Sequence, residues 1–149
     1  MSVRQLGAQV AKAVGEQLES LGFQRRRNVY RRDRPGFVER YAIVGDRWNS
    51  GATPWRFHVD AGIYFPDLPI RSDSVGFWRE AHAVGTVGAI AEATPVDFEV
   101  SQSTVDEVAA LVAKSIVAAS DKISAWAPAA RERAERGLCS PLPIPENWP

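Results

Sequence analysis

The chain lacks the residues on which several classes of protein depend. Its 149 residues include a single cysteine, Cys139, so neither an internal disulfide nor a multi-cysteine zinc site can form. No apolar run reaches membrane-spanning length, and polar residues interrupt residues 1–10, which excludes a signal-peptide pattern. No phosphate-binding loop or metal-ligand spacing occurs either. We therefore expect a cytoplasmic protein with no membrane association, no metal site and no cofactor.

Charge is balanced over the whole chain but not along it. Eighteen Lys and Arg residues match 18 Asp and Glu residues, so the formal net charge is zero. Residues 1–79 hold 13 cations against 8 acids, a net of +5, whereas residues 80–149 hold 5 against 10, a net of −5. A folded domain with this split can present surfaces of opposite sign. One acidic group, which no cation interrupts, would suit a basic partner protein: Glu80, Glu92, Asp97, Glu99, Asp106 and Glu107.

The N-terminal third has the pattern of a helix followed by a hairpin. Apolar residues recur every three or four positions over residues 3–21, which predicts an amphipathic helix, and Gly22 supplies its C-terminal stop. Two β-rich runs follow at 23–32 and 37–44, separated by a turn at 33–36 that contains Pro and Gly. The sequence therefore predicts two antiparallel strands after the first helix.

A third strand has the clearest alternation in the chain. Between residues 55 and 65 every odd position is apolar, and the even positions are Arg56, His58, Asp60, Gly62 and Tyr64. The small apolar run 84–91 and the short segment 98–100 are predicted to continue the sheet.

A second long helix is predicted near the C-terminus. Apolar residues from Val105 to Trp126 step by three and four, and Thr104 and Glu107 have the spacing of a capping box. We expect Pro128 to interrupt this helix and residues 129–137 to form a further short one.

Together these elements indicate an α+β fold. We expect a mainly antiparallel sheet of about four to five strands, with two long helices, one N-terminal and one C-terminal, packed on one face. Residues 1–137 would form a single domain, and residues 138–149, which contain four prolines, a proline-rich tail. The second face of the sheet would be at least partly free, and we expect a functional surface there.

Several motifs resemble a known family. They are the helix that leads into Leu21–Arg26, then Val29–Arg32, Trp48–Ser50 and Phe57–Tyr64. In this order they resemble the bacterial domain-of-unknown-function family 4304, over roughly the first half of the chain and the final helix. The resemblance implies a small α+β domain. Because that family carries no agreed catalytic residues, it assigns no chemistry to any position.

Six arginines lie within ten residues and are opposed only by Asp33: Arg25, Arg26, Arg27, Arg31, Arg32 and Arg34. Arginines that share a face could bind phosphate groups or acidic side chains. On a strand, however, successive side chains alternate between faces, and charged residues also protect edge strands from aggregation. Both interpretations stay open, and Arg25, Arg27 and Arg31 are the binding candidates.

A second candidate group lies on the predicted third strand. Arg56, His58 and Asp60 are spaced by two and share a face, where the carboxylate could orient the imidazole as a base. No nucleophile is placed beside them, and a histidine on a polar sheet face is usually solvated. We therefore assign no catalytic residue and treat Arg56, His58, Asp60 and Tyr64 as binding candidates.

These features favour a non-enzymatic protein-interaction module, with an inhibitor or immunity-like protein as one concrete form. One alternative is nucleic-acid binding through the arginine-rich residues 25–34, helped by Trp48, Trp78 and Trp148, although zero net charge argues against it. Another alternative is a small-molecule or hydrolytic site around His58 and Asp60.

Overall fold

The first helix has a complete cap at each end. The computed structural model describes residues 2–46, 54–70, 81–92 and 97–145, and its helix α1 spans Val3–Leu18. Ser2 and Gln5 form a capping box, in which the Ser2 hydroxyl accepts from the Gln5 amide at 3.2 Å. A 3-10 turn, Glu19–Leu21, and Gly22 at a φ of 90° then end the helix. The predicted helix and its glycine stop are confirmed.

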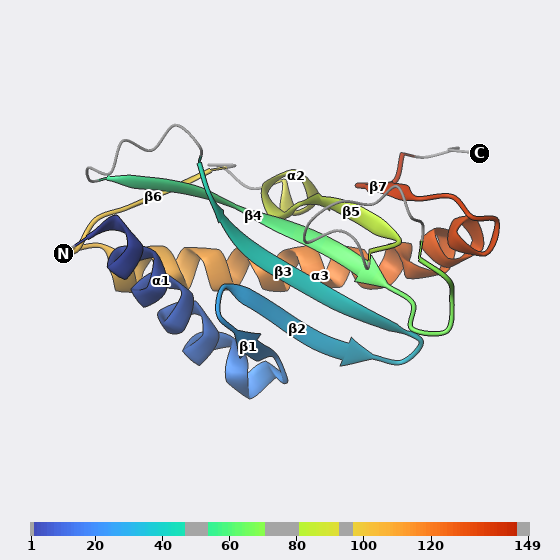
Figure 1. Ribbon diagram of the computed structural model, residues 1–149, viewed down its shortest axis with the longest axis horizontal. Coiled ribbons are helices and arrows are strands. Elements are labelled where there is room, and N and C mark those ends of the chain that lie inside the picture. Colours follow the sequence, from blue (N-terminus) through green and yellow to red (C-terminus); the bar gives the residue numbers. More distant parts are fainter. Residues whose placement is uncertain (1, 47–53, 71–80, 93–96, 146–149) are drawn as a thin grey trace.

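The described residues contain seven strands: β1 Gln24–Arg26, β2 Val29–Arg34, β3 Phe37–Gly45, β4 Trp55–Tyr64, β5 Ala83–Thr86, β6 Phe98–Val100 and β7 Ser140–Leu142. Their order in the sheet is β1-β2-β3-β4-β5-β7 (Figure 1). β3 runs along one edge of β4, and β6 and β5 share the other edge. All pairs are antiparallel except β5 with β7. The fold is thus α+β with a mostly antiparallel sheet.

The predicted count of four to five strands is wrong. The run predicted as one strand over 23–32 is divided by a turn at Arg27 and Asn28 into β1 and β2. The run 84–91 is also divided, because Thr86 caps a short helix, α2, Val87–Ala91, by accepting from the Ala89 amide. A short apolar run fits a buried helix as well as a buried strand, and here a capping threonine starts the helix. Part of the proline-rich tail adds β7 beside β5.

The last helix, α3, spans Val105–Glu135 and passes through Pro128, so the predicted interruption and the separate helix over 129–137 are wrong. Proline removes one backbone donor, but buried Ala127 and Ala130 continue the apolar stripe past it. The capping box predicted at Thr104 is also absent, because the Thr104 hydroxyl accepts from the Ser101 amide at 2.9 Å instead. The described residues thus form two long helices and the short α2, none of them long and apolar enough to cross a membrane.

The helices lie together on one face of the sheet (Figure 1). Tyr41, Phe57 and Ile63 point from the sheet into this core, and all three are at most 1% exposed. The second face is only partly open. Val38 and Ala42 belong to it by strand register, yet they are 3% and 2% exposed. The open part of that face lies toward β1 and β2, where the side chains are exposed or half-buried.

Candidate functional site

The β1–β2 hairpin carries the arginine run at one edge of the sheet. Its turn consists of Arg27 and Asn28, between the paired residues Arg26 and Val29. The Asn28 side chain donates to the Ile43 carbonyl at 2.7 Å, and the Ile43 amide donates back to the Asn28 carbonyl at 3.0 Å. These two hydrogen bonds hold the turn against β3, so the arginines project from a fixed support.

Arg27 has a backbone conformation that favours glycine. Its φ is 57°, and a non-glycine residue in the left-handed region costs about 1–3 kcal/mol. The Arg25 guanidinium stabilises the turn, because its Nη1 donates to the Arg27 carbonyl at 2.9 Å. Arg25 also lies against α1, where a Cβ on Gly15 would come within 2.8 Å of the Arg25 Cδ. Arg25 therefore supports the turn, and the exposed Arg27 side chain occupies a position where glycine would fit the backbone better.

The turn decides which arginines share a face. Arg26 pairs with Val29, and Arg31, two residues further along β2, pairs with Arg40 on β3, so these three arginines point to the face away from the helices. Arg25 pairs with Tyr30, which faces the core. The candidates Arg25 and Arg31 thus lie on opposite faces of the sheet.

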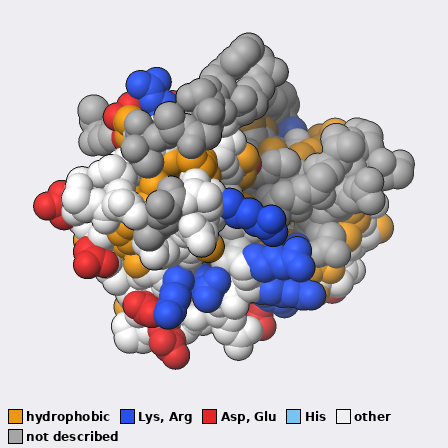
Figure 2. Space-filling model, turned by 60° about the vertical axis from the view of Figure 1, so that its left-hand side comes forward, with side chains coloured by type: hydrophobic (Ala, Val, Ile, Leu, Met, Phe, Trp, Pro, Cys, Tyr) orange, Lys and Arg blue, Asp and Glu red, His pale blue; other side chains and the backbone are white. Residues whose placement is uncertain are grey.

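A depression of about 630 Å³ lies among these side chains. It is lined by Gln24, Arg25, Arg26, Arg27, Asn28, Val29, Arg31 and Arg40. Arg31 pairs with Asp33 at 3.0 Å, but both side chains are well exposed, so the pair contributes little. Within the described part of the chain, Arg26 and Arg27 form no ion pair. Figure 2 shows Lys and Arg side chains gathered on one face of the molecule.

The other two arginines of the run have a structural role on the opposite face. Arg32 and Arg34 extend toward Glu39, whose side chain is fully buried, at 3.4 Å and 3.1 Å. Ser120 on α3 donates to the same carboxylate at 2.7 Å, and Tyr41 does so at 3.1 Å. These five residues, the Glu39 cluster, join the sheet to α3. The sequence cluster is therefore split between the two faces, as alternation along a strand requires.

Arg56, His58 and Asp60 lie on one face of β4, as predicted. His58 Nε2 is 3.1 Å from an Asp60 carboxylate oxygen, and Arg56 pairs with Glu99 on β6 at 2.8 Å. A depression of about 370 Å³ beside His58 is lined by Val44, Gly45, Asp46, Arg56, Phe57, His58 and Asp97. These lining residues include no Ser, Thr or Cys that could serve as a nucleophile. They could bind a cationic or polar group, and they hold no triad.

Tyr64, the fourth candidate on β4, is already packed between two partners. The Arg40 guanidinium lies 5.2 Å from its ring centre, and the His82 ring stacks on it at 5.7 Å with an interplanar angle of 6°. His82 is fixed in turn, because its Nδ1 accepts from the Phe65 amide and its Nε2 lies 3.0 Å from the Pro69 carbonyl. Tyr64 thus supports Arg40 at the border of the arginine-lined depression.

Replacing Asp60 with asparagine should change stability in a pH-dependent way. Burial raises the pKa of Asp60, and the neighbouring His58 opposes this increase. Since the raised pKa means that the native state holds this proton more tightly, the stabilisation by protonated Asp60 is lost as pH rises through the native pKa. Relative to wild type, Asp60→Asn should therefore gain stability as pH rises above the ordinary carboxyl pKa of 3.8 and through the raised native pKa. Urea unfolding at several pH values measures this, and a constant difference would contradict it.

The acidic group at 80–107 is partly paired within the protein. Glu99 contacts Arg56, and Glu92 lies 3.6 Å from Lys122. Asp106 and Glu107 occupy the first turn of α3, where carboxylates interact favourably with the positive end of the helix dipole. Glu80 and the three tryptophans considered for nucleic-acid contact, Trp48, Trp78 and Trp148, lie outside the described residues. The acidic side chains that are described do not gather around one depression.

The sequence reasoning missed three residues of the site: Arg26, Arg40 and Asn28. An uninterrupted strand would place Arg26 on the face opposite Arg25, Arg27 and Arg31. The two-residue turn reverses that assignment, and an asparagine at position 28 was the available signal for it. Arg40 lies outside the arginine run, and only the pairing of β2 with β3 brings it beside Arg31.

No family model, no curated protein and no solved structure matches this chain. The arrangement of its own residues is therefore the basis for the functional argument.

Proposed function

We propose that this protein is a non-enzymatic binding module that engages an acidic segment of a partner protein at the arginine-lined depression of the β1–β2 hairpin. The observation that carries the proposal is the pair Arg26 and Arg27, two exposed guanidinium groups with no acidic partner among the described residues. Exposed guanidinium groups on a rigid hairpin can form paired hydrogen bonds with carboxylates.

The backbone of Arg27 supports a binding role over a purely structural one. Residues in strained backbone conformations are held in place by the surrounding structure, and they are concentrated at binding and catalytic sites. At position 27 the fold would accept glycine, because the left-handed φ suits glycine and the side chain makes no described ion pair. The resemblance to family 4304 remains a prediction beside this proposal.

An acidic protein segment suits the surface better than a nucleic acid does. Nucleic-acid domains usually carry a positive excess, whereas this chain has zero net charge. Stacking on bases also requires exposed aromatic faces. Tyr64, the described aromatic residue on the same face as Arg26, Arg31 and Arg40, already stacks on His82 and lies beside the Arg40 guanidinium.

Removing the two unpaired charges should weaken binding of an acidic probe. We expect Arg26→Gln/Arg27→Gly to lower the affinity for a synthetic Glu/Asp-rich peptide by about three- to tenfold, because each exposed charge pair contributes about 0.2–1 kcal/mol. Binding to wild type should also weaken as salt is added. Nuclear magnetic resonance titration measures both effects and should locate the largest shifts in residues 24–31.

The matched control removes two charges elsewhere. Lys114 on α3 and Arg136 at its end are exposed and line neither this depression nor its neighbours, so Lys114→Gln/Arg136→Gln should bind the peptide like wild type. Arg27→Gly alone should leave the free energy of unfolding unchanged or raise it by about 1 kcal/mol. Equal losses in both double variants, or tighter binding of a charge-matched oligonucleotide, would overturn the proposal.

A further inference from the structure

A second depression, of about 670 Å³, adjoins the arginine-lined one and shares Arg25, Arg27 and Asn28 with it. It lies between the first turns of α1 and the ends of β3 and β4. Its apolar lining consists of Val3, Gly7, Ala8, Ala11, Ile43, Gly45 and Trp55. We refer to it as the Trp55 groove.

Two glycines make room for the Trp55 ring at the base of this groove. A Cβ on Gly7 would lie 3.2 Å from the ring, and a Cβ on Gly45 would lie 2.9 Å from it. One face of the indole stacks on Phe57, which is buried, yet Trp55 itself remains partly exposed. A rigid, half-exposed indole at the base of a groove is a suitable floor for an apolar side chain.

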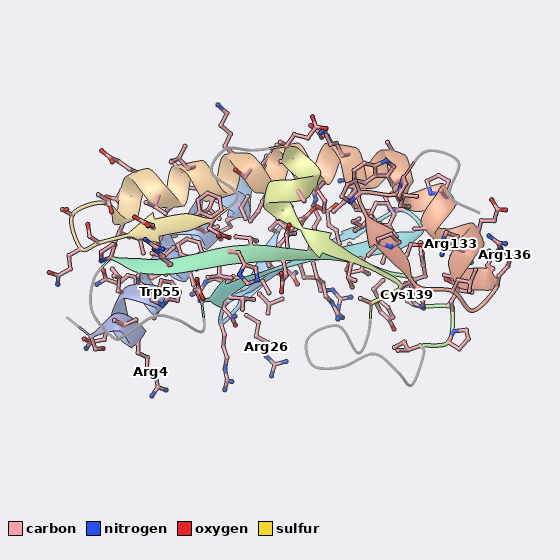
Figure 3. The ribbon with its side chains drawn as sticks, turned by 90° about the horizontal axis from the view of Figure 1, so that it is seen from above. Arg4, Arg26, Trp55, Arg133, Arg136 and Cys139 are labelled. Carbon is pink, nitrogen blue, oxygen red and sulfur yellow. The ribbon has the colours of Figure 1, made fainter. Side chains whose placement is uncertain are left out.

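The rim of the groove is cationic. Arg4 on α1 and Arg27 on the hairpin both line it, and neither forms an ion pair with a described residue. Figure 3 shows Arg4 and Arg26 projecting to the side of the sheet away from α3, with Arg4 at the end of the molecule that carries Trp55 and Arg26 nearer the middle. Figure 2 likewise shows hydrophobic side chains beside the Lys and Arg cluster. Groove and rim together select an occupant that has an apolar group beside negative charge.

We infer that the acidic partner segment carries an apolar side chain next to its carboxylates, and that this side chain enters the Trp55 groove while the carboxylates contact Arg4, Arg26 and Arg27. This inference rests on the proposed function, and it states which acidic segments the same surface would select. The arginines supply charge complementarity, which many acidic segments satisfy. The groove restricts the partner to a segment with a correctly placed leucine, phenylalanine or similar residue.

The test uses two synthetic peptides with identical acidic residues, one with a central leucine and one with serine in its place. Wild type should bind the leucine peptide at least about tenfold more tightly, which corresponds to burial of one apolar side chain. Ala8 is exposed on α1 and lines the groove. Ala8→Gln would fill it without a large change in helix propensity, and should abolish the difference between the peptides. The matched variant Ala118→Gln, on the exposed face of α3, should preserve it.

The outcomes separate the two proposals. If both peptides bind equally and Arg26→Gln/Arg27→Gly weakens both, the groove inference is wrong and the proposed function stands. If neither peptide binds, both are wrong. Dodecanoate and the serine peptide can each be tested as competitors of the bound leucine peptide. If dodecanoate displaces the leucine peptide at a lower concentration than the serine peptide does, the groove binds a free amphiphilic carboxylate. That result would also overturn the inference. Resonance shifts at Gly7, Ala8 and Gly45 with the leucine peptide alone would support it.

Discussion

Replacement of Glu39 by alanine should lower the free energy of unfolding by about 3 kcal/mol, the lower end of the range for breaking a buried ion pair. The Glu39 carboxylate is fully buried and receives four described contacts, from Arg32, Arg34, Tyr41 and Ser120. Without it, two guanidinium groups lose their counter-charge. The lower end applies because Arg32 and Arg34 are 21% and 30% exposed and can turn partly toward water.

Two milder variants divide this effect into its parts. Ser120→Ala removes one neutral donor to the carboxylate and should cost about 1 kcal/mol. Glu39→Gln keeps the size and an acceptor but removes the charge, so its loss should fall between those of Ser120→Ala and Glu39→Ala. Urea unfolding of the three variants gives the order. If Glu39→Ala cost less than Ser120→Ala, the carboxylate would be tolerated in the core without contributing to its stability.

The Glu39 cluster also shows what sequence patterns could not predict. The alternation of β3 places Glu39 on the apolar face, where a lone carboxylate is costly. Its partner Ser120 lies 81 residues away on α3, so no local pattern indicates that the charge is compensated. Arg32 and Arg34 belong to the arginine run in the sequence. Only the register of β2 with β3, which pairs them with Glu39 and Phe37, places them on the core side.

Elements that follow from local periodicity were predicted well. α1 with its Gly22 stop and the alternation of β4 required only the spacing of apolar residues and one glycine. Two of the errors occurred where a capping or turn residue interrupts the pattern. Thr86 starts α2 inside an apolar run, and Arg27 turns the chain with a positive φ although it is not glycine. Positions with positive φ are recognised in a sequence mainly by glycine, so an arginine at position 27 gives no sign of the turn.

The candidate site was predicted in part for the same reason. His58 and Asp60 meet as their spacing on one strand requires, because no other element is needed to bring them together. The arginine-lined depression depends on the turn and on β3. Arg26, Arg31 and Arg40 lie on one face of the sheet there, and Arg25, which lies on the other face, borders the same depression. Local spacing predicts contacts within a strand, whereas a surface built across strands requires their register.

Gly85→Ala should cause the other large loss of stability, about 2–4 kcal/mol, because β7 could no longer lie beside β5. A Cβ at position 85 would overlap the Leu142 carbonyl oxygen and would lie 2.7 Å from the Leu142 Cβ. Backbone atoms of a paired strand cannot move aside as a flexible side chain can. β7 would have to separate from β5, and its hydrogen bonds to β5 would be lost. The Leu142 side chain, which is 5% exposed, would become exposed and lose the roughly 1.5–3 kcal/mol that its burial contributes.

A glycine without a neighbour provides the control for this prediction. Gly36 has a φ of 85° and no heavy atom within 4 Å of a built Cβ, so Gly36→Ala should cost only its backbone strain, about 1 kcal/mol. Adding Leu142→Ala to Gly85→Ala should cost much less than Leu142→Ala costs in wild type, because the first change has already released β7. Additive losses in this double-mutant cycle would contradict the mechanism. Faster hydrogen exchange at the Ser140 amide, which donates to the His82 carbonyl at 3.0 Å, would support it.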